Sequence, residues 1–171
     1  MLEDQMKIAV LGHDSRAAAI GQLLVDAGYE VGFENAAECE LLVLAGPQNQ
    51  MDDLLAQAGQ IPPTTIVIDA MEGPVARGAG GPVQLARRLH SHRVVFASIA
   101  LPLTGANVLY CGDDAEAKTI VENVFRTAGC VTTDRGPLAN AAEIEVPRNT
   151  TGESSFETLK FANAAASADM R

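Results

Sequence analysis

The sequence has no tryptophan, and its aromatic residues are limited to five Phe and two Tyr among 171 residues. Alanine and glycine recur throughout the chain instead, so we expect a core of aliphatic side chains and close backbone contacts. Such a core is typical of layered folds in which helices pack on a sheet. Hydrophobic residues make up 47% of the composition, which is enough to bury a core and predicts a folded domain.

Positive charge is also scarce, because 12 Lys and Arg residues face 22 Asp and Glu residues and leave a net charge of −10. An acidic surface repels phosphate backbones, so we exclude nucleic acid as a main partner. The chain has three cysteines, Cys39, Cys111 and Cys130. An odd number outside any paired motif indicates buried free thiols in a reducing compartment rather than a disulfide framework.

Long hydrophobic runs are missing as well. Runs such as residues 94–103 are shorter than the roughly 18 to 20 apolar residues that cross a bilayer. Residues 1–4 (MLED) provide neither the basic nor the apolar part of a secretion signal. We therefore expect a cytoplasmic protein with no membrane partner.

What the sequence does contain is an alternation of short apolar runs with segments of helical periodicity. Apolar runs predict buried strands, and apolar residues spaced three and four apart predict helices. The alternation indicates a doubly wound α/β fold with a mainly parallel sheet. The predicted strands are residues 7–11, 30–33, 41–45, 65–69, 93–97, 107–111 and 130–133, and the predicted helices are residues 15–27, 49–58, 84–89 and 115–128.

The predicted helix 115–128 has the clearest ends. Asp113 and Glu116 form an Asp-x-x-Glu variant of the capping box at its start, and Gly129 follows its last turn. The paired acids Asp113 and Asp114 therefore indicate a helix cap rather than a catalytic pair.

The first strand is followed by a turn that carries the functional argument, Gly12-His13-Asp14-Ser15-Arg16-Ala17. In a Rossmann domain this turn reads Gly-x-Gly-x-x-Gly, and the second glycine lets the pyrophosphate approach the backbone. Here Asp14 places a carboxylate where the phosphates would sit. The helix start, with Asp14 or Ser15 as its N-cap, still offers N–H groups to an anion, and Arg16 is a candidate partner for a phosphate.

Two further segments are candidates for the same cleft. Glu34 follows the second strand about 20 residues after Gly12, the spacing at which an acid binds the ribose hydroxyls of NAD and repels the extra phosphate of NADP. A solvated loop residue is the alternative reading of Glu34. Ala45, Gly46 and Pro47 follow the third strand. The candidate cofactor-binding residues are Gly12, His13, Asp14, Ser15, Arg16, Glu34, Ala45, Gly46 and Pro47.

The order of motifs resembles the NADPH-dependent coenzyme F420 reductase (F420-dependent NADP oxidoreductase) family, over about residues 6–145. The resemblance lies in KIAVLG at 7–12, AECELLVLAGP at 37–47 and PVARGAGG at 74–81. Its most specific parts are GDDAEAK at 112–118 and GPLAN at 136–140. The resemblance implies a Rossmann fold with a short C-terminal region and, in active members, hydride transfer between NADPH and a deazaflavin, coenzyme F420.

The chain departs from the family pattern at two cofactor contacts. Family members usually carry a Ser-Arg pair after the second strand to hold the 2′-phosphate, and this chain has Glu34 and Asn35. A His-Thr pair beside the nicotinamide pocket is replaced by Ile99 and Ala100. NAD and NADP therefore both stay open as cofactors. We name no catalytic residue, because in hydride transfer the protein mainly positions the two rings.

A deletion separates the second and third predicted strands. Only residues 34–40 connect them, whereas a parallel crossover needs a dozen residues or more. The helix and strand usual in a Rossmann fold therefore do not fit. Either the sheet has lost its outer strand or a partner chain supplies it, and an uncovered edge promotes association, so we expect a homodimer.

Two hypotheses follow from these observations. The first is a truncated, divergent NAD(P)-binding oxidoreductase of the F420-dependent NADP reductase type. The second is a degenerate, non-catalytic Rossmann-fold binding or assembly module, which Asp14, Ile99 and the deletion favour. In either case we expect a Rossmann-type dinucleotide-binding domain over residues 1–146 and a C-terminal helix or tail over residues 147–171. We expect no metal site, since His90-Ser91-His92 lacks a nearby third ligand.

Overall fold

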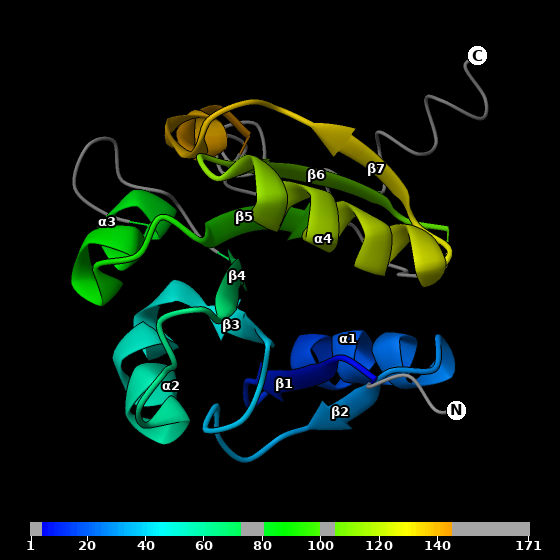
Figure 1. Cartoon of the computed structure of the whole chain (residues 1–171), viewed down its shortest axis with the longest axis vertical. Helices are drawn as coiled ribbons and strands as arrows, with labels where there is room; N and C mark the ends of the chain where they lie inside the picture. The colour runs from blue at the N-terminus through cyan, green and yellow to red at the C-terminus, as the bar shows by residue number, and fades with distance from the viewer. Residues whose placement is uncertain (1–4, 73–80, 100–104, 145–171) are drawn as a thin grey trace.

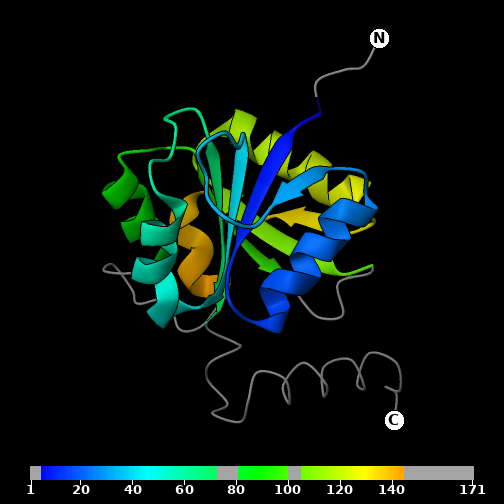
Figure 2. The same ribbon diagram turned by 90° about the horizontal axis from the view of Figure 1, so that it is seen from below.

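The computed structural model describes residues 5–72, 81–99 and 105–144. The strands of these residues form one sheet in the order β2-β1-β3-β4-β5-β6-β7, with helices on both sides (Figures 1 and 2). The elements are β1 (Lys7–Leu11), α1 (Ser15–Asp26), β2 (Glu30–Gly32), β3 (Leu41–Pro47), α2 (Met51–Ala58), β4 (Ile66–Glu72), α3 (Gly81–Leu89), β5 (Val94–Ile99), β6 (Asn107–Gly112), α4 (Ala115–Thr127) and β7 (Val131–Asp134), with short 3-10 turns η1 (Gln48–Gln50) and η2 (Leu138–Asn140).

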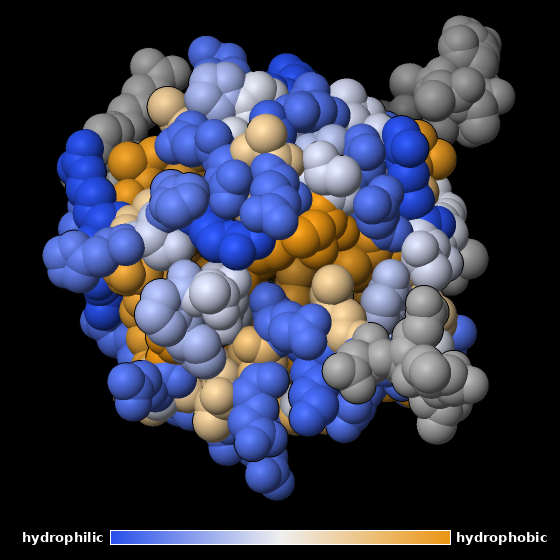
Figure 3. Space-filling view, in the orientation of Figure 1, coloured by the Kyte–Doolittle hydropathy of each residue, from blue (hydrophilic) through white to orange (hydrophobic). Residues whose placement is uncertain are grey.

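The helices form two layers around the sheet. Helices α1 and α4 pack on one face, where Ile20 and Phe125 are fully buried, and α2, α3 and η2 pack on the other, where Leu54 is fully buried (Figure 2). Polar side chains cover most of the face seen in Figure 3, with apolar ones showing between them. The central strands are buried on both faces, which explains why they are continuous apolar runs in the sequence.

The sheet is mainly parallel, as the alternation of elements predicts. Strands β2, β1, β3, β4 and β5 pair in parallel, β6 is antiparallel to β5, and β7 is parallel to β6. The antiparallel direction of β6 depends on its pairing with β5 and was not predicted from the sequence. Strand β1 lies between β2 and β3, so the strand order reverses there. In open α/β sheets ligands bind at such a switch point, outside the carboxyl ends of the strands.

The connection between β2 and β3 is short and contains no helix or strand, as the sequence predicts. Residues 33–40 cross β1 without a helix or strand of their own. The backbone N–H of Ala36 donates to the carbonyl of Ala58 at 3.0 Å, and that of Glu40 donates to the carbonyl of Lys7 at 2.8 Å. The connection therefore packs on the α2 side of the sheet. In the described residues β2 is the edge of the sheet and pairs with β1 alone.

The two motifs most specific to the family resemblance hold β6, α4 and β7 together. The N–H of Gly112 donates to the carbonyl of Gly136 at 3.0 Å. Lys118 Nζ forms an ion pair with Asp134 Oδ1 at 2.9 Å, and Asp113 Oδ1 accepts from the N–H of Leu138 at 2.9 Å. Gly112 pairs with Val95 near the start of β5, so this cluster lies at the amino edge of the parallel strands, opposite the expected cleft.

The cap of α4 differs from the prediction. Asp114 is the N-cap, and its side chain accepts from the N–H of Glu116, whereas Asp113 binds Leu138. The prediction of a capping box formed by Asp113 and Glu116 is therefore wrong by one residue. The Asp113 side chain binds η2 instead of capping the helix. No helix of the described residues is long and apolar enough to span a membrane. The predicted C-terminal segment, residues 147–171, lies outside the described residues.

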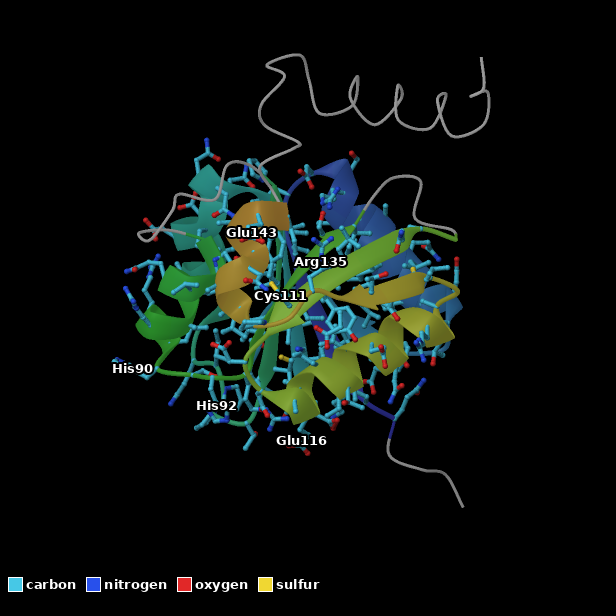
Figure 4. The ribbon with its side chains drawn as sticks, turned by 90° about the horizontal axis from the view of Figure 1, so that it is seen from above. His90, His92, Cys111, Glu116, Arg135 and Glu143 are labelled. Carbon is cyan, nitrogen blue, oxygen red and sulfur yellow. The ribbon has the colours of Figure 1, made fainter. Side chains whose placement is uncertain are left out.

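The three cysteines are buried and free, as predicted. Burial raises the pKa of each thiol, that of Cys111 from 9.0 to about 12. The Cys111 thiol lies inside the molecule (Figure 4) and contacts the carbonyl of Leu138 at 3.7 Å.

We expect the protein to lose stability in alkali because of these thiols. Below about pH 9 the thiols are protonated in both the folded and unfolded chain, and at higher pH only the unfolded chain releases its protons. The free energy of unfolding therefore falls as pH rises, by about 1.4 kcal/mol at pH 10 from Cys111 alone. Urea unfolding from pH 7 to pH 10.5 measures this slope. Cys111→Ala should flatten it, and an equally steep slope in that variant would contradict the assignment.

Candidate functional site

The turn between β1 and α1 lies at the switch point, against the end of β3. A Cβ atom on Gly12 would lie 2.4 Å from the carbonyl oxygen of Ala45 and 2.5 Å from the Cβ of Ala17. Both distances are far below van der Waals contact, and the first partner is rigid backbone. Only glycine therefore fits at this position, where the first glycine of a dinucleotide-binding turn stands.

Asp14 occupies the start of α1. It is the N-cap residue, and its Oδ1 accepts from the N–H groups of Arg16 and Ala17, each at 3.1 Å. Its backbone carbonyl accepts from Ala18 at 3.3 Å. The expectation that these N–H groups are available to an anion is therefore wrong for Arg16 and Ala17. The reason is that a short carboxylate at an N-cap satisfies the unpaired donors of the first helical turn.

Arg16 lies in the protein interior, with only 5% of the residue exposed. Its Nη2 donates to the carbonyl of Ile99 at 2.8 Å, and its Nε donates to the carbonyl of Ala70 at 3.4 Å. The guanidinium thus ties α1 to the carboxyl ends of β4 and β5. The structure does not place Arg16 where a phosphate on the turn would need it. These carbonyls lie far along the chain from Arg16, so no local pattern predicts the contact.

A cavity of about 470 Å³ opens beside the turn. It extends from the turn along the flank of α1 to the end of β2. Its lining residues are Gly12, His13, Asp14, Ala17, Ala18, Gln22, Val25 and Phe33. Three of the predicted site residues, Gly12, His13 and Asp14, are therefore brought together. Gln22, Val25 and Phe33 were missed, although strand alternation places Phe33 on the same side as Val31, which packs with α1.

Glu34 lines a different cavity. That cavity, of about 630 Å³, lies between β1, β2 and the connection 33–39, and Lys7, Glu30, Glu38 and Cys39 also line it. The backbone carbonyl of Glu34 accepts from Gln57 Nε2 at 3.4 Å. The structure therefore does not bring Glu34 into the cavity beside Gly12. The shortened connection explains this placement, because it turns toward α2 directly after β2.

The end of β3 does meet the turn. Gly46 has φ +130, and a Cβ atom there would lie 3.3 Å from Gln50 Oε1 and 3.8 Å from Asp14 Oδ2. Ala45 is fully buried. Within the described residues Gln50 Oε1 is buried and has no hydrogen-bond partner, so an unsatisfied polar atom lies beside the turn. Sequence reasoning did not find Gln50, since an isolated glutamine after a strand carries no signal.

Ile99 and Ala100 are the residues that replace the family's His-Thr pair. Ile99 at the end of β5 is 1% exposed, and Arg16 occupies its carbonyl. Ala100 lies outside the described residues. No cluster of three His, Cys, Asp or Glu residues suited to a metal ion occurs in the described chain. His90 and His92 lie after α3, away from the cleft (Figure 4), and His92 Nε2 is 3.7 Å from Asp114 Oδ2.

Sequence comparison finds no matching protein-family model and no matching curated protein. Comparison of structures finds clear similarity. A provisionally assigned F420-dependent NADP-reductase from Arthrobacter sp. FB24 has a TM-score of 0.74 at 20% identity, covering 94% of this chain and 95% of that one.

Two other similar structures are a larger dehydrogenase and a larger reductase. Prephenate dehydrogenase from A. aeolicus, in complex with hydroxyphenyl propionate and NAD⁺, has a TM-score of 0.69 at 11% identity, covering 98% of this chain and 69% of that one. Pyrroline carboxylate reductase from Plasmodium falciparum, with NADP bound, has a TM-score of 0.67 at 13% identity, covering 95% and 69%. The chain therefore has the Rossmann-like fold of NAD(P)-dependent reductases.

Proposed function

We propose that this protein binds a nicotinamide dinucleotide at the carboxyl edge of its sheet and acts as an NAD(P)-dependent oxidoreductase. The observation that carries the proposal is the contact of Gly12 with Ala45 and Ala17, which forces glycine at the start of the turn. That turn lies at the switch point of the sheet, where dinucleotides bind in this fold. The proposed contacts are Gly12, His13, Asp14, Ser15 and residues 45–47.

Asp14 limits the affinity of such a site. A pyrophosphate at the helix start must displace the Asp14 carboxylate from the N–H groups of Arg16 and Ala17. Two like charges would otherwise compete for one positive helix end. We therefore expect dissociation constants in the upper micromolar range or weaker.

The proposed electron acceptor is coenzyme F420 or a similar deazaflavin. The support is the family resemblance of the sequence and the similarity to the Arthrobacter protein. The bound dinucleotide supplies the chemistry, which is transfer of a hydride to the acceptor ring. The protein holds the two rings in contact and excludes water, and buried apolar groups such as Ile99 suit that task.

A second candidate function is a non-catalytic binding or assembly module with the same fold. The observation that favours it is the pair of internal contacts at the cleft, Asp14 on the helix N–H groups and Arg16 on the carbonyls of Ala70 and Ile99. The first contact occupies helix N–H groups that a pyrophosphate would use, and the second keeps Arg16 from pairing with a phosphate on the turn. In either function we propose a homodimer, because the β2 edge is uncovered in the described residues; light scattering measures its mass.

Thermal unfolding with added NADH or NADPH at millimolar concentration tests the proposal. At a nucleotide concentration about ten times a dissociation constant of about 1 mM, binding adds about 1.4 kcal/mol to the free energy of unfolding, so a rise in melting temperature is expected. A second assay mixes the protein with NADPH and oxidised F420 and follows loss of reduced nicotinamide absorbance. Binding with turnover supports the oxidoreductase. Binding without turnover favours the module, and no shift with either nucleotide contradicts dinucleotide binding.

A further inference from the structure

Phe33 is an unusual exposed aromatic side chain in a chain with few aromatics. Its relative exposure is 50%, and the other large apolar residues exposed in the described chain are Val25 and Val131. Phe33 and Val25 line the same cavity, and that cavity also reaches Gly12, His13 and Asp14. Phe33 also lines the larger cavity that holds Glu34, so this residue borders both cavities.

The Phe33 ring packs against Gly21 of α1. A Cβ atom on Gly21 would lie 2.5 Å from Cε1 and 2.8 Å from Cζ of Phe33. The ring therefore lies directly on the backbone of α1, where only glycine leaves room for it. Glycine weakens a helix interior, so the chain carries a locally unfavourable residue at the position that the ring contacts.

The chemistry of the cavity suits an uncharged planar ring at this end. The lining residues of the described chain include no lysine or arginine, and their one acidic side chain is that of Asp14. An aromatic ring with an exposed face binds a nucleobase by stacking. A phosphate group at this end would find no lysine or arginine among the residues that line this cavity.

We propose that Phe33 is the stacking platform for the adenine ring of the bound dinucleotide and that it favours NAD over NADP. The proposal rests on the proposed dinucleotide binding. It also accounts for the missing outer strand and helix, because the ring provides a wall for the adenosine half of the cofactor that the shortened connection 33–40 does not. The adenine would lie beside Phe33 and Val25, with the pyrophosphate toward Gly12.

Calorimetric titration of Phe33→Ala with ADP-ribose and with NAD⁺ tests the platform. We expect both ligands to bind about tenfold more weakly, because they share the adenine and because base stacking on an aromatic ring is worth about this factor. Phe33→Tyr keeps the ring and should bind within about threefold of the natural protein. Val131→Ala removes an exposed apolar side chain on β7, at the other end of the sheet, and should change neither affinity.

Gly21→Ala provides an independent test that keeps Phe33. The added methyl group displaces the Phe33 ring from the surface of α1. Alanine itself favours the helix more than glycine does. We expect ADP-ribose to bind several-fold more weakly with no loss of thermal stability. In the natural protein NADP⁺ should bind more weakly than NAD⁺.

The outcomes separate the platform from the proposed function. If the natural protein binds neither NAD⁺ nor ADP-ribose, the dinucleotide function fails and the platform fails with it. If it binds both, and Phe33→Ala binds them equally well, the platform alone is overturned. A Phe33→Ala variant could also change its oligomeric state while its affinities for NAD⁺ and ADP-ribose stay the same. That result would show that a second copy of the chain covers the ring, and it would also overturn the platform.

Discussion

Replacing Asp14 with glycine is expected to tighten the binding of NAD⁺ by about tenfold or more. The Asp14 carboxylate accepts from the N–H groups of Arg16 and Ala17, and glycine releases both donors to the pyrophosphate. It also removes a negative charge from the site. Hydrogen bonds to a charged group are worth about 1.5–3 kcal/mol each, so a tenfold gain, about 1.4 kcal/mol, is a conservative expectation.

The same change should leave the fold nearly as stable, because glycine is an accepted N-cap that costs only a few tenths of a kcal/mol relative to Asp. Asp114→Gly is the matched control. Asp114 caps α4 by the same type of contact but lies at the opposite edge of the sheet, so its replacement should not change NAD⁺ affinity. Unchanged or weaker binding by Asp14→Gly would mean that the phosphates do not lie at this turn.

Replacing Gly12 with alanine is expected to destabilise the protein by about 3 kcal/mol or more and to abolish dinucleotide binding. The new Cβ would lie 2.4 Å from the Ala45 carbonyl oxygen, and this atom belongs to the backbone of a buried central strand. Forcing a methyl group into such a contact requires the strand and helix to separate, and overpacking of this kind costs about 1–3 kcal/mol even where side chains can move.

Urea unfolding and calorimetry measure the two effects of Gly12→Ala. Gly32→Ala is the matched control, because Gly32 lies in the neighbouring strand β2 and nothing lies within 4 Å of its added Cβ. Its free energy of unfolding should stay within about 0.5 kcal/mol of the natural value. A Gly12→Ala protein as stable as this control would contradict the close contact with β3.

The motif segments GDDAEAK and GPLAN show how a sequence signature and a binding site differ. They were the most specific part of the family resemblance, yet their contacts join β6, α4 and η2 at the amino edge of the parallel strands. The Lys118–Asp134 pair and the Asp113–Leu138 hydrogen bond fix the packing of this corner. They therefore stabilise the fold at this corner and lie away from the proposed cofactor cleft.

Most of the fold was predictable from the sequence, because its elements arise from local patterns. Apolar runs buried on both faces gave the strands, and the Gly12 turn followed by α1 was recognisable from residue types and spacing alone. The short connection after β2 was equally evident, since chain length limits what a crossover can contain.

The chemistry of the cleft was decided by contacts between residues distant along the chain. Arg16 reaches Ala70 and Ile99, Phe33 lies on Gly21, and Glu34 faces a different cavity from the turn. No local pattern encodes these partners, because a side chain's direction and neighbours depend on how strands and helices pack. The sequence by itself therefore determined a Rossmann-type α/β domain with a glycine-dependent turn, whereas only the tertiary structure decided which side chains occupy the cleft.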